Sequence, residues 1–80
     1  MDNKFEERIK DVLANVFGIS IEIIQDNTSP DNISTWDSLN HINMIVAIEE
    51  EFQITLSEDS IMQMNNYALI KTILINEYLN

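Results

Sequence analysis

The chain has 80 residues, of which 14 are acidic and 4 are basic, so its formal net charge is -10. A chain this short buries only about 60–65% of the surface that it exposes when unfolded, which argues against a deep, enclosed active site. A surface this negative repels nucleic acid and anionic lipid headgroups, and it attracts basic patches on other proteins. Nucleic acid is therefore excluded as a partner, and a protein partner is favoured.

The chain contains no cysteine, which rules out a disulfide framework and a thiolate metal site. Any thiol chemistry must come from a group that the protein acquires. No apolar signal segment opens the sequence, and no apolar run approaches the roughly 20 residues that span a bilayer. We therefore expect a cytoplasmic protein without membrane insertion, folded as a single domain over residues 1–80.

The first expected helix begins near Asn3, which has capping-box spacing with Glu6. Gly18 ends it, because glycine readily adopts the left-handed conformation found at helix C-termini. Its apolar residues follow a helical period and predict one buried face: Phe5, Ile9, Val12, Leu13, Val16 and Phe17.

Residues 19–36 break the helical period and predict a long loop containing one helical turn. The stretch 26–32 is rich in Asp, Asn and Ser, and Pro30 disfavours helix at the residue before it. An apolar cluster near the start of the loop is expected to hold it against the core: Ile19, Ile21, Ile23 and Ile24.

The second expected helix begins at Asp37 or Ser38 and runs through Phe52. Asp37 is suited to capping the helix, which leaves Ser38 at the first helical position with its hydroxyl facing outward. One side of this helix is expected to face the core, with Ile45, Ile48 and Phe52. A neighbouring face beside Ser38 carries Leu39, Ile42 and Val46, followed by Glu49, Glu50 and Glu51. A serine beside an apolar strip and acidic residues is typical of a docking surface.

Two shorter helices complete the expected fold. Ser57 caps a short acidic helix from Glu58 to about Met62, and the last helix runs from about Tyr67 to Leu79. We expect five residues of the last helix to face the core: Leu69, Ile70, Ile73, Leu74 and Tyr78. Three methionines are interpreted as packing residues: Met44, Met62 and Met64. The predicted fold class is all-α, a four-helix bundle with a long first loop and a short third helix.

The segment Asp37-Ser38-Leu39 resembles the attachment motif of acyl carrier proteins. The helix that follows continues the likeness as Leu-x-x-Ile-x-x-x-Val-x-x-Glu-Glu-Glu-Phe. The similarity extends over the whole chain, from a first helix ending in Phe17-Gly18-Ile19 through the long polar loop to the closing helix. The tripeptide alone is weak evidence, but its position between a long loop and an acidic helix is specific.

The resemblance implies a carrier that is not itself an enzyme. A phosphopantetheinyl transferase, holding coenzyme A and magnesium, would attach 4'-phosphopantetheine to Ser38. Asp37 would act as the helix cap, as support for the transferase reaction, or as both. The arm would supply the missing thiol and carry an acyl or aminoacyl group as a thioester. The implied partners are that transferase, a loading ligase and an acyl-accepting enzyme, which dock on Leu39, Ile42, Val46, Glu49 and Glu50. We expect a monomer.

Asp37, Ser38 and His41 lie within one helical turn, but a hydrolytic triad also needs an oriented base and an oxyanion hole. His41 is instead interpreted as a boundary residue or a partner contact, and Trp36 as an anchor for the loop or a neighbour of the arm. No metal site is expected. An EF-hand loop starting at Asp26 would place Asp31 where glycine is required and Pro30 at a ligand position.

One difference from the family pattern bears on which cargo the carrier holds. Fatty-acid carriers commonly have acidic residues where this chain has Asn40 and Asn43. The form Trp-Asp-Ser-Leu-x-His resembles carriers of dedicated pathways, which load unusual acyl, aminoacyl or hydroxyacyl units. The alternatives are a carrier of fatty-acid synthesis and an unmodified acidic helical adaptor for a basic partner.

Overall fold

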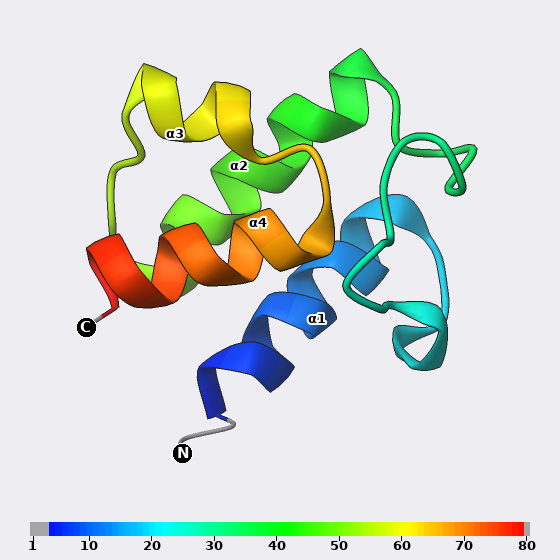
Figure 1. Cartoon of the computed structure of the whole chain (residues 1–80), viewed down its shortest axis with the longest axis horizontal. Helices are drawn as coiled ribbons and strands as arrows, with labels where there is room; N and C mark the ends of the chain where they lie inside the picture. Colours follow the sequence, from blue (N-terminus) through cyan, green and yellow to red (C-terminus); the bar gives the residue numbers. More distant parts are fainter. Residues whose placement is uncertain (1–3, 80) are drawn as a thin grey trace.

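The computed structural model describes residues 4–79, and within that range it contains helices and no strand (Figure 1). The elements in chain order are α1 (Lys4–Phe17), the 3-10 turn η1 (Ile21–Ile23), α2 (Ser38–Phe52), α3 (Glu58–Gln63), α4 (Tyr67–Ile73) and the π-helical turn η2 (Leu74–Tyr78). The predicted all-α class, long first loop and short third helix are confirmed. The expected cap at Asn3 lies outside the described residues.

Helices α1 and α2 pack side by side and run in opposite directions. Near the start of α1, Arg8 bonds to the Glu51 carboxylate at 2.8 Å and lies 4.5 Å from the centre of the Phe52 ring. Near its end, the Phe17 ring stacks on Trp36, which directly precedes α2, with ring centres 4.7 Å apart. These contacts at both ends set the register of the two longest helices.

The core is formed by apolar residues from α1, α2 and α4, from the first loop and from the segments that flank α3. Its fully enclosed members include Phe17, Met44, Ile48, Met64 and Ile70. The predicted core stripe of α2 is confirmed at Ile45 and Ile48, while Phe52 lies at its margin and is half-buried. Burial of this apolar surface is the main free-energy term that holds the helices together.

The first loop is tied to the helices by specific bonds. Thr28 is buried, its hydroxyl accepts from the Gln25 amide at 2.8 Å, and its carbonyl accepts from the Tyr67 amide at 2.9 Å. The carbonyl of Asp26 accepts from the Ala68 amide at 3.1 Å. The carbonyl groups of the loop therefore act as hydrogen-bond acceptors for amides in the first turn of α4, which lack acceptors within that helix. The expected helical turn in this loop is confirmed as η1.

The end of the chain is tied to the start of α3. Ser57 caps α3 as predicted, since its hydroxyl accepts from the Ser60 amide at 3.1 Å. The Tyr78 hydroxyl accepts from the Ser57 amide at 3.0 Å and also contacts the side-chain hydroxyls of Ser57 and Ser60. Hydrogen bonds with the Ser57 hydroxyl, then the Ser60 hydroxyl and then the Ser57 amide lower the pKa of Tyr78. The last helical segment therefore holds the connection between α2 and α3 in place.

Several side chains expected in the core are exposed. Met62 is 74% exposed and Leu69 is 39% exposed, which corrects their assignment as packing residues. Ile21 and Ile23 are also exposed, so the loop is held by Ile24, with Ile19 partly buried beside the core. Each of these errors concerns a short element, where the neighbouring helix covers only part of the apolar face. Within residues 4–79, no helix is long and apolar enough to cross a membrane.

Two isoleucines of α2 provide a matched test of the core. Ile48 is 0% exposed and Ile42 is 60% exposed. Because Ile48→Ala leaves a cavity, it should lower the free energy of unfolding by about 2–5 kcal/mol. Ile42→Ala should change it by no more than about 0.5 kcal/mol. Denaturant titration measures both values, and similar losses for the two variants would show that the core face of α2 is misassigned.

Tyr67 opens α4 with a buried side chain whose hydroxyl makes no hydrogen bond of good geometry among the described residues, although the Glu6 carboxylate lies near enough to interact with it. Lys10 and Lys71 lie over its ring, with their amines 5.6 and 5.3 Å from the ring centre. Burial raises the pKa of Tyr67 well above its ordinary value of 10.0, and the charges of Glu6 and Asp26 act in the same direction. A buried hydroxyl without a partner destabilises the fold.

Replacing Tyr67 by Phe should therefore raise the free energy of unfolding, by on the order of 1 kcal/mol at neutral pH. Because the folded protein holds the phenolic proton more tightly than the unfolded chain, the wild type should also lose stability as the pH rises above the ordinary value of 10.0. Tyr67→Phe should not show the part of the alkaline loss of stability that comes from ionisation of Tyr67. Urea titrations from neutral to alkaline pH measure it. A variant less stable than the wild type at neutral pH would show that the hydroxyl has a stabilising partner.

Candidate functional site

Ser38 is the first residue of α2, and its side chain is exposed. Asp37 precedes it in an extended conformation and caps the helix, with its carboxylate accepting from the Asn40 amide at 2.8 Å. The predicted cap is thus confirmed. The first amides of a helix have no intrahelical acceptors, so the Ser38 hydroxyl lies at a positively polarised helix end. This geometry leaves a primary hydroxyl accessible at the surface.

Trp36 and His41 flank this helix start and contact each other. The Trp36 indole N–H donates to His41 Nδ1 at 3.1 Å, so Nδ1 carries no proton. In the neutral ring the proton is then on Nε2, which lies 3.3 Å from the Ile61 carbonyl oxygen. His41 therefore links the first loop, α2 and α3. Trp36 is 4% exposed and stacks on Phe17, which confirms its expected role as an anchor of the loop.

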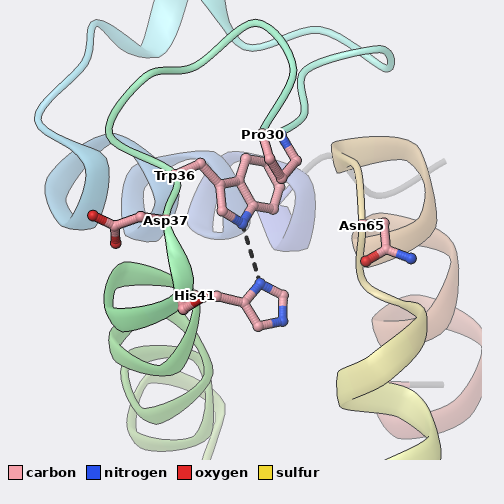
Figure 2. Close-up of a pocket in the computed structure, with 6 residues that line it drawn as sticks. Pro30, Trp36, Asp37, His41 and Asn65 are labelled. Carbon is pink, nitrogen blue, oxygen red and sulfur yellow. Dashed lines mark hydrogen bonds between the residues drawn. The ribbon is translucent and has the colours of Figure 1, made fainter.

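A pocket of about 400 Å³ lies beside Ser38. It is lined by Pro30, Trp36, Asp37, Ser38, His41 and Asn65. Figure 2 shows Trp36 and His41 on one side of the opening and Asn65, from the connection between α3 and α4, on the other. The Asp37 carboxylate points away from Asn65 (Figure 2). Asp37 is the one acidic residue of the lining, and none of the other five lining residues carries a negative charge.

The apolar strip predicted beside Ser38 is exposed. Leu39 is 67% exposed, Ile42 is 60% exposed and Val46 is 48% exposed. The polar residues next to them are neutral and bonded to one another, since Asn40 accepts from Asn43 at 3.0 Å and donates to the Thr35 carbonyl at 2.8 Å. The first two turns of α2 therefore expose apolar and amide side chains and no acidic residue.

The three consecutive glutamates differ in their surroundings. Glu49 accepts from the Leu56 amide at 2.9 Å, and Glu51 is paired with Arg8. The Glu50 side chain is exposed and has no partner among the described residues. Glu49 and Glu50 line a shallow acidic depression of about 490 Å³, together with Val46, Gln53, Ile54 and Thr55. Val46 therefore joins the apolar strip to this depression.

Sequence reasoning missed two residues of the pocket, Pro30 and Asn65. Neither belongs to a recognisable motif, and only the packing of the loops brings them to Ser38. It also missed the bond between Trp36 and His41, although their spacing across the helix start is compatible with it. No cluster of His, Cys, Asp or Glu that could hold a metal ion occurs within residues 4–79.

Comparisons with known proteins identify the family. Residues 7–72 match the family described as "Phosphopantetheine attachment site". The chain is also 38% identical over 64 residues to an acyl carrier protein of Buchnera aphidicola subsp. Schizaphis graminum (strain Sg), a match that covers 79% of this chain and 80% of that relative. The chain belongs to the acyl carrier protein family. It is thus a carrier and not an enzyme, and the alternative of an unmodified adaptor is rejected.

Carriers of this family hold their cargo on a covalently attached 4'-phosphopantetheine. The residues present fit such a group, because an exposed hydroxyl lies at a helix N-terminus that favours a phosphate, with a pocket of about 400 Å³ next to it. The group would supply the thiol that the cysteine-free chain lacks.

Proposed function

We propose that Ser38 of this carrier bears the phosphopantetheine arm and that Asp37 supports its attachment. The observation that carries the proposal is the exposed hydroxyl of Ser38 at the first position of α2, inside the region that matches the attachment-site family. Ser38 also lies in an Asp-Ser-Leu motif. No other serine of the chain combines this motif with the start of a long helix.

Attachment is a phosphoryl transfer carried out by a phosphopantetheinyl transferase. The Ser38 oxygen forms a bond to the phosphorus that bears the pantetheine, its proton passes to a base, and the bond to the nucleotide part of coenzyme A breaks. The exposed helix end makes the Ser38 oxygen accessible to a large enzyme. Its amide groups also stabilise the charge of the new phosphodiester.

Asp37 serves this reaction in two compatible ways. As a cap it holds the first turn of α2 through the Asn40 amide, which fixes the position of Ser38. Capping occupies one carboxylate oxygen, and an ionised carboxylate accepts several bonds or binds a metal. The exposed carboxylate of Asp37 thus has capacity to contact the magnesium ion of the transferase.

Partner enzymes dock on the apolar strip Leu39, Ile42 and Val46 and on the acidic depression beside it. Exposed apolar side chains in a row are typical of protein interfaces. The depression contributes Glu49 and Glu50, of which Glu50 has no partner among the described residues. The partner surface is therefore an apolar patch next to a basic side chain, with no basic group required opposite Asn40 and Asn43.

The same neutral first turns favour a dedicated biosynthetic pathway over fatty-acid synthesis. In this proposal the protein is a cytoplasmic monomer that receives an unusual acyl, aminoacyl or hydroxyacyl group from a ligase and presents it to an acyl-accepting enzyme. The support is the replacement of acidic docking residues by Asn40 and Asn43, which interact with each other rather than with a basic partner.

Labelling with coenzyme A, magnesium and a broad-specificity transferase tests the attachment site. Intact-mass analysis should show one phosphopantetheine added to the wild type and none added to Ser38→Ala. Ser34→Ala is the matched control, since Ser34 is an exposed serine in the preceding loop and should not be needed. Failure to label the wild type, under conditions that modify another carrier, would refute the proposal.

The rate of the same labelling reaction reports on docking. Ile42→Ala should slow labelling without unfolding the protein, because it removes exposed apolar contact area. Glu50→Gln should also slow it, whereas the matched change Glu51→Gln, at the residue paired with Arg8, should have less effect. Equal effects of the two glutamine variants would argue against Glu50 as the docking carboxylate.

The cargo distinguishes the two pathway assignments. Mass spectrometry of the protein isolated from its own cells should show a thioester-bound acyl unit of one composition, as a dedicated pathway requires. A series of saturated chains of increasing length would instead identify a carrier of fatty-acid synthesis and refute the pathway assignment.

A further inference from the structure

We propose that the pocket between Trp36 and Asn65 is a resting site for the part of the phosphopantetheine arm nearest to Ser38, which consists of the branched pantoyl group and its amide. The inference rests on the proposed attachment at Ser38 and goes beyond it. It assigns Trp36, Pro30 and Asn65 to binding the arm, and it makes His41 the residue that positions Trp36.

Tethering explains why this part of the arm is the occupant. Ser38 itself lines the pocket, so a group attached to its oxygen starts at the pocket edge. The volume of about 400 Å³ lies near the lower end of the range for small-molecule sites, roughly 300–1,000 Å³. It suits the near section of the arm and leaves the distal thiol and its cargo outside, where partner enzymes reach them.

The pocket walls match the chemistry of the pantoyl group. Pro30 supplies an exposed ring surface, and the small accessible part of the buried Trp36 indole adjoins it, so the two methyl groups would pack against this wall. Across the opening, the exposed Asn65 side chain has no partner among the described residues and both donates and accepts hydrogen bonds (Figure 2). An amide and a hydroxyl on the arm are the complementary groups.

The electrostatics of the pocket also favour the arm. Asp37 is the one acidic residue of the lining, and its carboxylate points away from Asn65 and accepts the Asn40 amide (Figure 2). Its charge is therefore directed away from the pocket interior. The arm is uncharged beyond its phosphate, and the phosphate would lie at the positively polarised start of α2. A pocket whose one acidic side chain points away from Asn65, next to a helix N-terminus, fits both parts.

His41 holds this pocket in shape without needing to touch the arm. Its Nδ1 accepts the Trp36 indole proton at 3.1 Å, while its Nε2 lies 3.3 Å from the Ile61 carbonyl oxygen on α3. Both ring nitrogens are thereby engaged, and the indole is additionally stacked on Phe17. A binding surface fixed before the ligand arrives loses less conformational entropy on binding.

Nuclear magnetic resonance of the holo protein tests the proposal. The chain has one tryptophan, so its indole signals are unambiguous. After transferase labelling, the pantoyl methyl protons should show nuclear Overhauser contacts to the Trp36 ring, and the indole N–H signal should shift relative to the unmodified protein. Asn65→Ala should weaken these contacts, whereas the control Asn15→Ala, at an exposed asparagine of α1, should leave them unchanged.

His41→Phe tests the positioning role, because phenylalanine keeps a ring but cannot accept the indole proton. It should shift the indole N–H signal in the unmodified protein and reduce the methyl contacts in the holo protein, with Ser38 still labelled. An increase in mass without contacts between the pantoyl methyls and Trp36 would overturn the resting site and leave the attachment at Ser38 intact. Absence of the mass increase would instead overturn the attachment, and the resting site with it.

Discussion

Burial of Trp36 is the constraint on which the site depends. Its indole is 4% exposed, stacks on Phe17 at the end of α1 and donates to His41 one turn into α2. Because Trp36 lies two residues before Ser38, fixing the indole also fixes where α2 begins. The long first loop thus ends at a defined point, and the serine lies at the helix start instead of in a mobile connection.

The charges of the carrier are distributed unevenly around this point. The formal net charge is -10, yet the first two turns of α2 carry no acidic residue and present Leu39, Ile42 and two asparagines. An acidic surface attracts basic proteins over a distance, while the surface beside Ser38 is apolar and carries no acidic side chain. In the docking that we propose, long-range attraction and local recognition are therefore carried by different residues.

The helices and the helix start at Ser38 could be predicted because they depend on residues that are close together in the sequence. The cap at Asp37 acts within one turn, and the apolar period of α2 marks Ile45 and Ile48 as buried. The prediction was wrong for Met62 and Leu69, since a periodic apolar face in a short helix is buried only where another element covers it. It placed Phe52 in the core, but this residue lies at the edge beside Arg8.

The sequence by itself determined the fold class, the bounds of α2 and the serine at its head, because capping and helical periodicity involve residues close together in the chain. Only the tertiary structure decided which residues surround that serine. Asn65 and Pro30 reach the pocket, and His41 meets the Ile61 carbonyl, through the packing of the first loop and α3 against α2. Contacts between distant segments depend on how whole elements pack, and no local pattern in one sequence encodes them.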